Sequence, residues 1–158
     1  MESLIVFVGA VTGMLALFAV VEAVKPGASL PRVPGWRARG LAFFAVGMVL
    51  SILAPFVWDE WLGAHRLVDG SGLGTWGGAL VGFLVLELGV YAWHRTMHTS
   101  NRLWRVHQLH HSAERLDVYG AFYFHPLDII GFAFVYSFTL VMVTGVTAEA
   151  AMIANGLA

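Results

Sequence analysis

Long apolar runs alternate with short polar connections along the 158-residue chain. Four of these runs, at 3–24, 40–58, 76–93 and 127–147, carry almost no charge. Each is about 18–22 residues long, close to the ~20 residues that a helix needs to cross the hydrocarbon core of a bilayer. The pattern predicts an all-α integral membrane protein with about four transmembrane helices, forming a single membrane domain over 1–158.

Several features at the ends of the runs support these boundaries. The third run has a tryptophan at each end, Trp76 and Trp93, as is typical of membrane interfaces. Pro126 suits the first position of a helix, and an acid such as Asp128 is favoured in the first turn. No basic residue precedes the first run, which is also long enough to span, so we interpret it as a retained span and not as a signal peptide.

Basic residues predict the orientation of the spans. The first and third connections carry four basic residues each and the second carries one, so the positive-inside rule places the first and third connections in the cytoplasm. A net charge of -1 gives no indication of a nucleic-acid partner, and the absence of cysteine excludes disulfides and thiolate metal sites. The nine basic residues are Lys25, Arg32, Arg37 and Arg39, then Arg66, then Arg95, Arg102, Arg105 and Arg115.

Six of the seven histidines lie in the third connection, the region 94–126. His94 and His98 are four residues apart, so a continuing third helix would present both on one face. The sequence Thr-Ser-Asn at 99–101 predicts a turn and a new helix start, followed by a second helix over about 102–115. This helix would present three more histidines on one face. The predicted metal ligands are His94, His98, His107, His110 and His111.

Other polar residues near these histidines are candidate partners of the ligands. Glu87 and Tyr91 share a helical stripe with His94 and His98, so Glu87 is either a hydrogen-bond partner of a ligand imidazole or a protonated acid bonded to a neighbouring helix. His125 could be a ligand, an outer hydrogen-bond donor or a helix cap, and we favour the last two roles. His65 is interpreted as an ordinary residue of the membrane interface.

The histidine spacing resembles that of the sterol desaturase/fatty acid hydroxylase superfamily. The resemblance is carried by "HRTMH" and by "LWRVHQLHHSAERLDVYGAFYFHPLD", and extends from about Glu87 to Asp128. His94 and His98 match the first histidine box of the family, and His107, His110 and His111 match its second. Ser112 to Arg115 and the pair His125-Pro126 match stretches that commonly follow. The resemblance implies a histidine-ligated di-iron centre on the cytoplasmic face of the membrane.

The resemblance also implies an activity. Family members use O2 to hydroxylate or desaturate a lipid such as a sterol or a fatty acyl chain, and the electrons would come from an external donor. Zinc can replace iron in such a site because it also binds imidazole. The family usually continues with a final H-x2-H-H box, so we expect this chain to be incomplete at its C-terminus. A missing segment or a homo-oligomeric partner would then complete the site.

A different class of function remains open from the sequence. The chain could be a non-catalytic membrane metal-binding or interaction protein derived from the same family. A haem protein would need histidines on facing spans, whereas these cluster at one membrane face. A zinc hydrolase is disfavoured because "HRTMH" lacks the glutamate of the H-E-x-x-H motif.

Overall fold

The computed structural model describes residues 2–158, and every regular element in this part of the chain is helical. Short 3-10 turns at Ala54–Val57, Gly70–Leu73 and Gly120–Phe122 and a π-helical segment at Phe138–Val143 complete the elements. The α-helices are α1 (Glu2–Val24), α2 (Trp36–Leu53), α3 (Asp59–Ala64), α4 (Gly74–Thr99), α5 (Asn101–His111), α6 (Pro126–Ser137) and α7 (Ala148–Leu157).

Within the described part of the chain, three helical segments are long and apolar enough to cross a membrane. They are Trp36–Val57, Gly70–Thr99 and Pro126–Val143, and α1 adds a shorter apolar stretch over Val8–Val24. Large apolar side chains such as Leu80, Leu84 and Leu88 are exposed along α4, as expected of a lipid-facing surface. The predicted all-α membrane fold is therefore confirmed.

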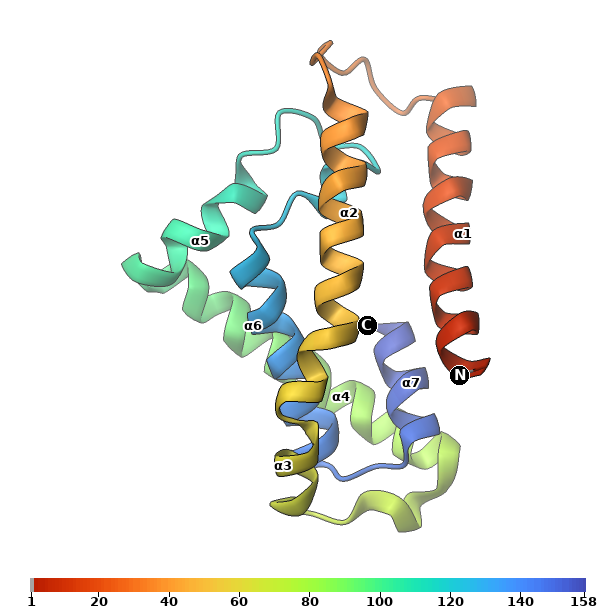
Figure 1. The fold of residues 1–158 in the computed structure, drawn as a ribbon, viewed down its shortest axis with the longest axis vertical. Coiled ribbons are helices and arrows are strands. Elements are labelled where there is room, and N and C mark those ends of the chain that lie inside the picture. The colour runs from red at the N-terminus through yellow and green to blue at the C-terminus, as the bar shows by residue number, and fades with distance from the viewer. Residues whose placement is uncertain (1) are drawn as a thin grey trace.

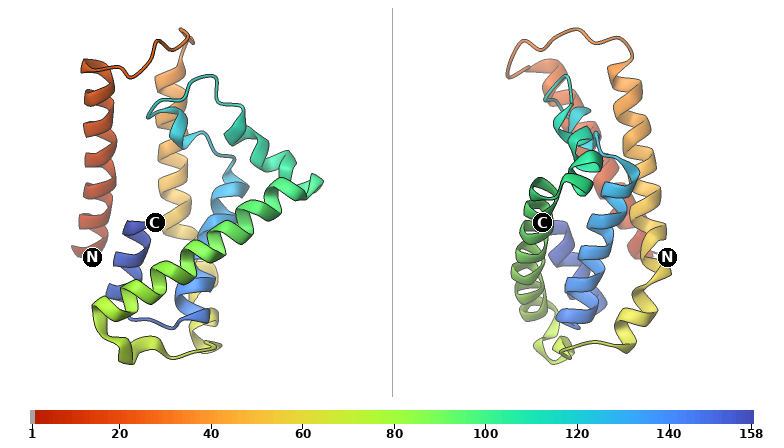
Figure 2. Two further views of the ribbon diagram at one scale, coloured as in Figure 1. Left: turned by 180° about the vertical axis from the view of Figure 1, so that it is seen from behind. Right: turned by 90° about the vertical axis from the view of Figure 1, so that its left-hand side faces the viewer.

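The helices form a compact group with α1 standing to one side (Figures 1 and 2). Helix α2 packs against α6, and α4 crosses obliquely behind them and contacts α5, α6 and α7. The connection after α1 and the connection after α5 meet at the same end of the molecule, where Arg115 donates to the carbonyl of Pro31 at 2.6 Å. This agrees with a chain that alternates direction at each span.

Asp117 holds these two connections together. Its carboxylate accepts hydrogen bonds from Trp36 Nε1 and Arg115 Nε, each at 2.8 Å, and from the backbone N–H of Gly120 at 3.0 Å. Burial alone would raise the pKa of Asp117, but these hydrogen bonds outweigh it, so the pKa lies below its ordinary value. Glu22 of α1 also accepts from the backbone N–H of Val118, at 3.0 Å. The loop before α6 is thus tied to both α1 and α2.

The fourth apolar run differs from the single helix predicted over 127–147. Helix α6 passes into the π-helical segment, which ends at Val143, and Gly145 then takes a left-handed backbone conformation with φ of 55°. A side chain at Gly145 would meet the carbonyl of Val68, so only glycine fits this reversal. The backbone N–H of Gly70 donates to the carbonyl of Thr144 at 3.0 Å, which fixes the turn. The remaining residues fold back as α7.

Helix α7 packs closely against α4 because both helices present small residues. A Cβ atom placed on Gly78 would lie 3.0 Å from the Cβ of Ala150, and one on Gly82 would lie 3.4 Å from that of Ala154. Ala150 and Ala154 are fully buried. Small residues four apart on both helices allow the backbones to approach, which is a common way for helices to associate in membranes. This packing supports the N-terminal half of α4, which contains Gly78 and Gly82.

We expect the substitution Gly82→Leu to destabilise the fold. The new side chain would collide with Leu140 and Ala154, and overpacking of this kind typically costs about 1–3 kcal/mol. The matched control is Gly77→Leu, on an exposed face of the same helix, where a Cβ meets only Leu73 at 3.6 Å. Thermal unfolding in detergent, followed by circular dichroism, measures the difference. Equal unfolding temperatures for the two variants would contradict the α4–α7 packing.

Candidate metal centre

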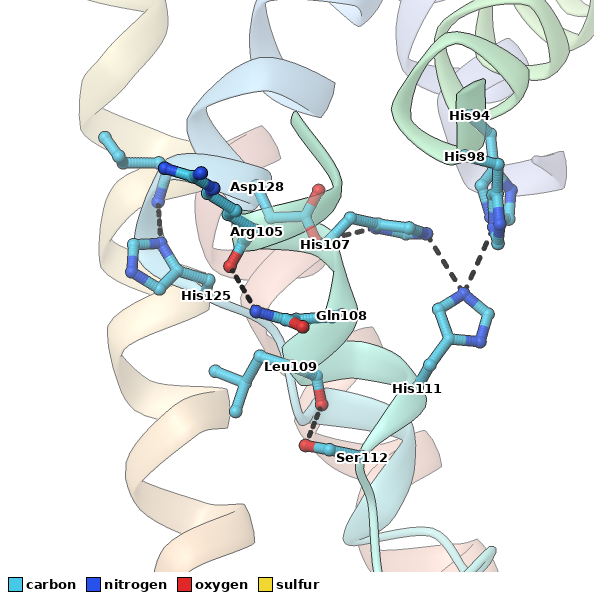
Figure 3. A network of polar contacts seen from close by, with 11 residues as sticks. His94, His98, Arg105, His107, Gln108, Leu109, His111, Ser112, His125 and Asp128 are labelled. Carbon is cyan, nitrogen blue, oxygen red and sulfur yellow. Dashed lines mark hydrogen bonds and ion pairs between the residues drawn. The ribbon is translucent and has the colours of Figure 1, made fainter. Parts of the chain in front are cut away.

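Helices α4 and α5 form a hairpin that carries the histidines. The third apolar run continues without a break to Thr99, as predicted, and Ser100 then adopts an extended conformation that ends α4 and begins α5. The backbone N–H of Trp104 donates to the carbonyl of Ser100 at 2.8 Å, which closes the first turn of α5. Helix α5 ends at His111, four residues earlier than predicted. Both histidine faces turn toward the inside of this hairpin (Figure 3).

Four imidazoles converge at one point. The Nε2 atoms form a continuous series, with separations of 2.9 Å from His94 to His98, 3.1 Å from His98 to His111 and 3.2 Å from His111 to His107. All four ligand atoms lie within 4.8 Å of one another. Neighbouring nitrogens around a metal, with bonds of about 2.1 Å, are separated by about 3.0 Å in an octahedron and about 3.4 Å in a tetrahedron. The three consecutive separations therefore fit neighbouring ligands of one metal ion.

Hydrogen bonding alone does not account for this cluster. A neutral imidazole nitrogen either donates one N–H or accepts through one lone pair. His98 Nε2 and His111 Nε2 each have two close neighbours, so at most two of the three contacts can be hydrogen bonds at once. A cation would accept one lone pair from each of the four nitrogens and satisfy them together. The donor set therefore fits a metal better than it fits an empty pocket.

Asp128 orients His107 through Nδ1, the ring nitrogen that does not face the cluster. His107 Nδ1 lies 2.9 Å from Asp128 Oδ2, and both side chains are almost fully buried. An ionised carboxylate only accepts, so the proton sits on Nδ1 and the lone pair of Nε2 points to the other histidines. Metal-bound histidines commonly donate their second N–H to a carboxylate in this way, which fixes the ring and makes it a stronger ligand.

The local environment also favours neutral imidazoles in α5. Burial, followed by the neighbouring rings of His107 and His98, lowers the pKa of His111. Burial, followed by His111 and His107, also lowers the pKa of His110. A lowered histidine pKa means that the neutral, ligand-competent form persists to more acidic pH. These imidazoles are thus unprotonated at neutral pH.

His110 lies apart from the cluster of four nitrogens. Its ring stacks on that of Phe124, with centroids 4.1 Å apart and planes inclined by 9°. Its Nδ1 is buried and has no hydrogen-bond partner within the described part of the chain. The structure thus brings together four of the five predicted ligands, and the ligand roles of all five stay predictions.

The other predicted partners occupy different positions. Glu87 is exposed on α4, and the hydroxyl of Tyr91 accepts from Arg95 Nη1 at 2.9 Å, away from the histidines. His125 precedes α6, and its Nδ1 accepts from the backbone N–H of Leu127 at 3.1 Å, which is the role of a helix cap. His65 stacks on Trp61 far from this site. Figure 3 shows His125 apart from the four clustered rings.

Sequence reasoning missed the role of Asp128. The sequence predicts only a place at the start of a helix for this residue, and it does lie there, in the first turn of α6. An acid placed shortly after a histidine-rich connection is a pattern that could have indicated a partner for a ligand. The pairing across 21 positions with His107 nevertheless depends on how α6 returns to α5, and spacing alone does not give that.

No solved structure matches this chain. Among characterised proteins, it is 35% identical over 81 residues to the ornithine lipid hydroxylase OlsE of Rhizobium tropici. That alignment covers 51% of this chain and 21% of the relative, so the chain spans about a fifth of the length of the protein it matches. The model of the fatty acid hydroxylase family matches residues 79–158, which include all four clustered histidines and Asp128. With half of its length matched, the chain belongs to the fatty acid hydroxylase family.

Proposed function

We propose that this chain carries the metal-binding part of a membrane-bound, iron-dependent enzyme that uses O2 to hydroxylate a lipid. The observation that carries the proposal is the convergence of His94, His98, His107 and His111 at one end of a group of apolar helices. The family match supports the same activity. The name of the relative suggests an acylated membrane lipid as the class of substrate, and desaturation of such a lipid is the nearest variant.

Iron with O2 would supply an oxidant strong enough to break an unactivated C–H bond. The overall hydroxylation would consume one C–H bond, one O2 molecule, two electrons and two protons, and it would give one C–OH group and one water. The two electrons would come from a separate donor protein. The residues of this chain would hold the metal and orient its ligands. Asp128 sets the tautomer of His107, and the lowered pKa of His111 favours the neutral form of that ring.

The site at the end of α4 suits a substrate that arrives through the membrane. Exposed apolar side chains cover α4 up to Leu88, six residues before His94. A lipid chain lying along this surface would reach the metal without entering water, which is favourable because its hydrocarbon stays in an apolar environment. We also propose that the histidines face the cytoplasm, since four basic residues lie in each of the two connections at that end.

A complete di-iron centre would need donors from outside these four residues. Four nitrogens fill most of the coordination of one ion, whereas two irons of five or six ligands need roughly ten donors, some of them water. His110 is the nearest further imidazole, with its ring centroid 5.7 Å from that of His107. We propose that a second copy of the chain or a further segment supplies the remainder.

The test combines metal content with oxygen incorporation. The chain is expressed with iron, purified in detergent, analysed for metals, and incubated with acylated lipids, 18O2 and a reducing system. We expect bound iron and a lipid product heavier by one 18O atom. Bound metal without any oxygen incorporation, even after a second histidine-bearing segment or copy is supplied, would instead favour the non-catalytic metal-binding protein.

A further inference from the structure

A cavity with a volume of about 440 Å³ lies at the start of α2. Its walls are the segment 32–38 and Arg115, which belongs to the connection after α5. The start of α2 and this connection meet at one end of the molecule (Figure 1). The volume falls within the range of about 300–1,000 Å³ that is typical of small-ligand sites. Three of the lining residues are arginines and none of them is acidic, so the cavity favours an anion.

One wall of the cavity is a tight turn that precedes α2. The backbone N–H of Trp36 donates to the carbonyl of Val33 at 3.3 Å, with Pro34 and Gly35 between them. Gly35 has φ of 70° and ψ of 8°, which is the conformation of the second central residue in a type II turn. Proline fixes the first central position, and glycine adopts a positive φ without strain. The shape of this wall is thus set before any ligand binds.

Asp117 holds the opposite wall in place. Its carboxylate accepts from Arg115 Nε and from Trp36 Nε1, each at 2.8 Å, so one acid fixes two lining residues. Arg115 Nη1 also donates to the carbonyl of Pro31 at 2.6 Å. A guanidinium has five N–H donors, and these two bonds leave three of them for a ligand. Arg115 therefore offers donors in a fixed position, although Asp117 balances its charge.

Arg32 and Arg37 supply the net charge of the cavity. Neither forms an ion pair within residues 2–158, whereas Arg39, the next arginine along α2, pairs with Glu114 at 3.4 Å. The guanidinium of Arg37 lies 5.9 Å from the centre of the Tyr119 ring, a contact that favours a cation without neutralising it. Two unbalanced positive charges thus belong to the lining of one cavity.

We propose that this cavity binds a phosphate group, and that the headgroup of an anionic membrane lipid supplies it. A guanidinium is planar and always charged, and its paired N–H groups match two oxygens of a phosphate. Arg32 and Arg37 would outweigh the single negative charge of a phosphodiester, and Arg115 would add its free donors. The first turn of α2 contributes a further partial positive charge. The proposal does not depend on the reaction that the metal centre performs.

The position of the cavity favours a lipid as the source of the phosphate. The segment Trp36–Val57 is long and apolar enough to cross a membrane, and the cavity lies where this segment begins. Its arginines are therefore at the depth of the lipid headgroups, where basic side chains attract anionic lipids. Exposed apolar side chains further along α2, such as Leu41 and Val49, would contact the acyl chains. A soluble phosphate would gain nothing from that surface.

The test measures lipid retention by the full chain in a neutral detergent, with native mass spectrometry. The probes are dioleoylphosphatidylglycerol, which is anionic, and dioleoylphosphatidylcholine, whose choline cancels the charge of its phosphate. The test variant combines Arg32→Gln with Arg37→Gln, and the matched control combines Arg102→Gln with Arg105→Gln. The control also removes two exposed arginines, but they belong to α5 and do not line the cavity.

The wild-type chain should prefer the anionic lipid, because choline would meet two unbalanced guanidiniums. An arginine near a membrane surface strengthens the binding of an anionic lipid roughly fivefold, so loss of Arg32 and Arg37 should lower the affinity for dioleoylphosphatidylglycerol about 30-fold. The control pair should lower it by less than about threefold, because charges outside the site act through screening solvent. Circular dichroism verifies that both variants keep their helical content.

Glycerol 3-phosphate separates the two sources of the phosphate. Retention of dioleoylphosphatidylglycerol against a large excess of glycerol 3-phosphate assigns the site to a lipid headgroup. Binding of glycerol 3-phosphate as tight as that of the lipid, with the same dependence on Arg32 and Arg37, keeps the phosphate site but overturns its assignment to lipid. Equal losses in the two pairs of variants overturn the proposal altogether. A wild-type chain that neither prefers the anionic lipid nor binds glycerol 3-phosphate does the same.

Discussion

The substitution His107→Ala is expected to lower the metal affinity of the chain by more than about 100-fold. This imidazole is fully buried, is the one that Asp128 orients, and contributes one of the four converging nitrogens. Loss of an outer hydrogen-bond partner alone typically costs 10–100-fold in metal affinity, and loss of the ligand itself should cost more. Titration against a competing chelator, with iron or zinc, measures the change.

Two further variants make this result specific. His65→Ala is the matched control, because that histidine stacks on Trp61 outside the site and should leave the affinity unchanged. His110→Ala tests whether the site uses four histidines or the predicted five, because the ring of His110 stacks on Phe124 and lies outside the cluster of four. We expect a much smaller loss for His110→Ala than for His107→Ala. Equal losses would show that the site uses all five, and no loss for His107→Ala would contradict the cluster.

The second large effect is expected at Asp128. Asp128→Ala removes the acceptor that holds the proton on His107 Nδ1, so the ring is free to rotate and to exchange tautomers. We expect the metal affinity to fall by about 10–100-fold, as for other carboxylate partners of metal-bound histidines. Asp128→Asn keeps an acceptor oxygen and should lose less. The measurement is the same chelator titration, with circular dichroism to verify the helical content.

Glu149→Gln provides the control for this position. Glu149 is likewise an acid in the first turn of a helix, but it is exposed, and its carboxylate accepts from Thr75 at the other end of α4. Glu149→Gln should therefore leave the metal affinity unchanged, because this acid lies far along α4 from the histidines. An unchanged affinity in Asp128→Ala would exclude the orienting role.

The helical membrane fold and the histidine hairpin follow from local patterns. Apolar runs of about 20 residues predicted the spans because a bilayer leaves few alternatives to a helix. Spacing of four residues predicted that His94 and His98 share a face, and the turn at Ser100 followed from the residues around it. Each of these features depends on neighbours within one or two helical turns.

Long-range features could not be predicted in the same way. The fourth run ends at Val143 because Gly145 reverses the chain against Val68, and that contact joins segments far apart in the sequence. His110 occupies the same helical face as His107 and His111 by spacing, yet its ring meets Phe124 from the following loop. The pairing of Asp128 with His107 likewise requires the return of α6. Hydropathy and spacing contain no information on such contacts.

The hairpin of α4 and α5 makes the histidine cluster a local structure. All four nitrogens lie between His94 and His111, so bringing them together closes only a short loop and costs little chain entropy. Contacts between neighbours in sequence form sooner than distant ones. The cluster itself therefore depends only on the α4–α5 hairpin, whereas its support by Asp128 also requires α6 to be docked against that hairpin.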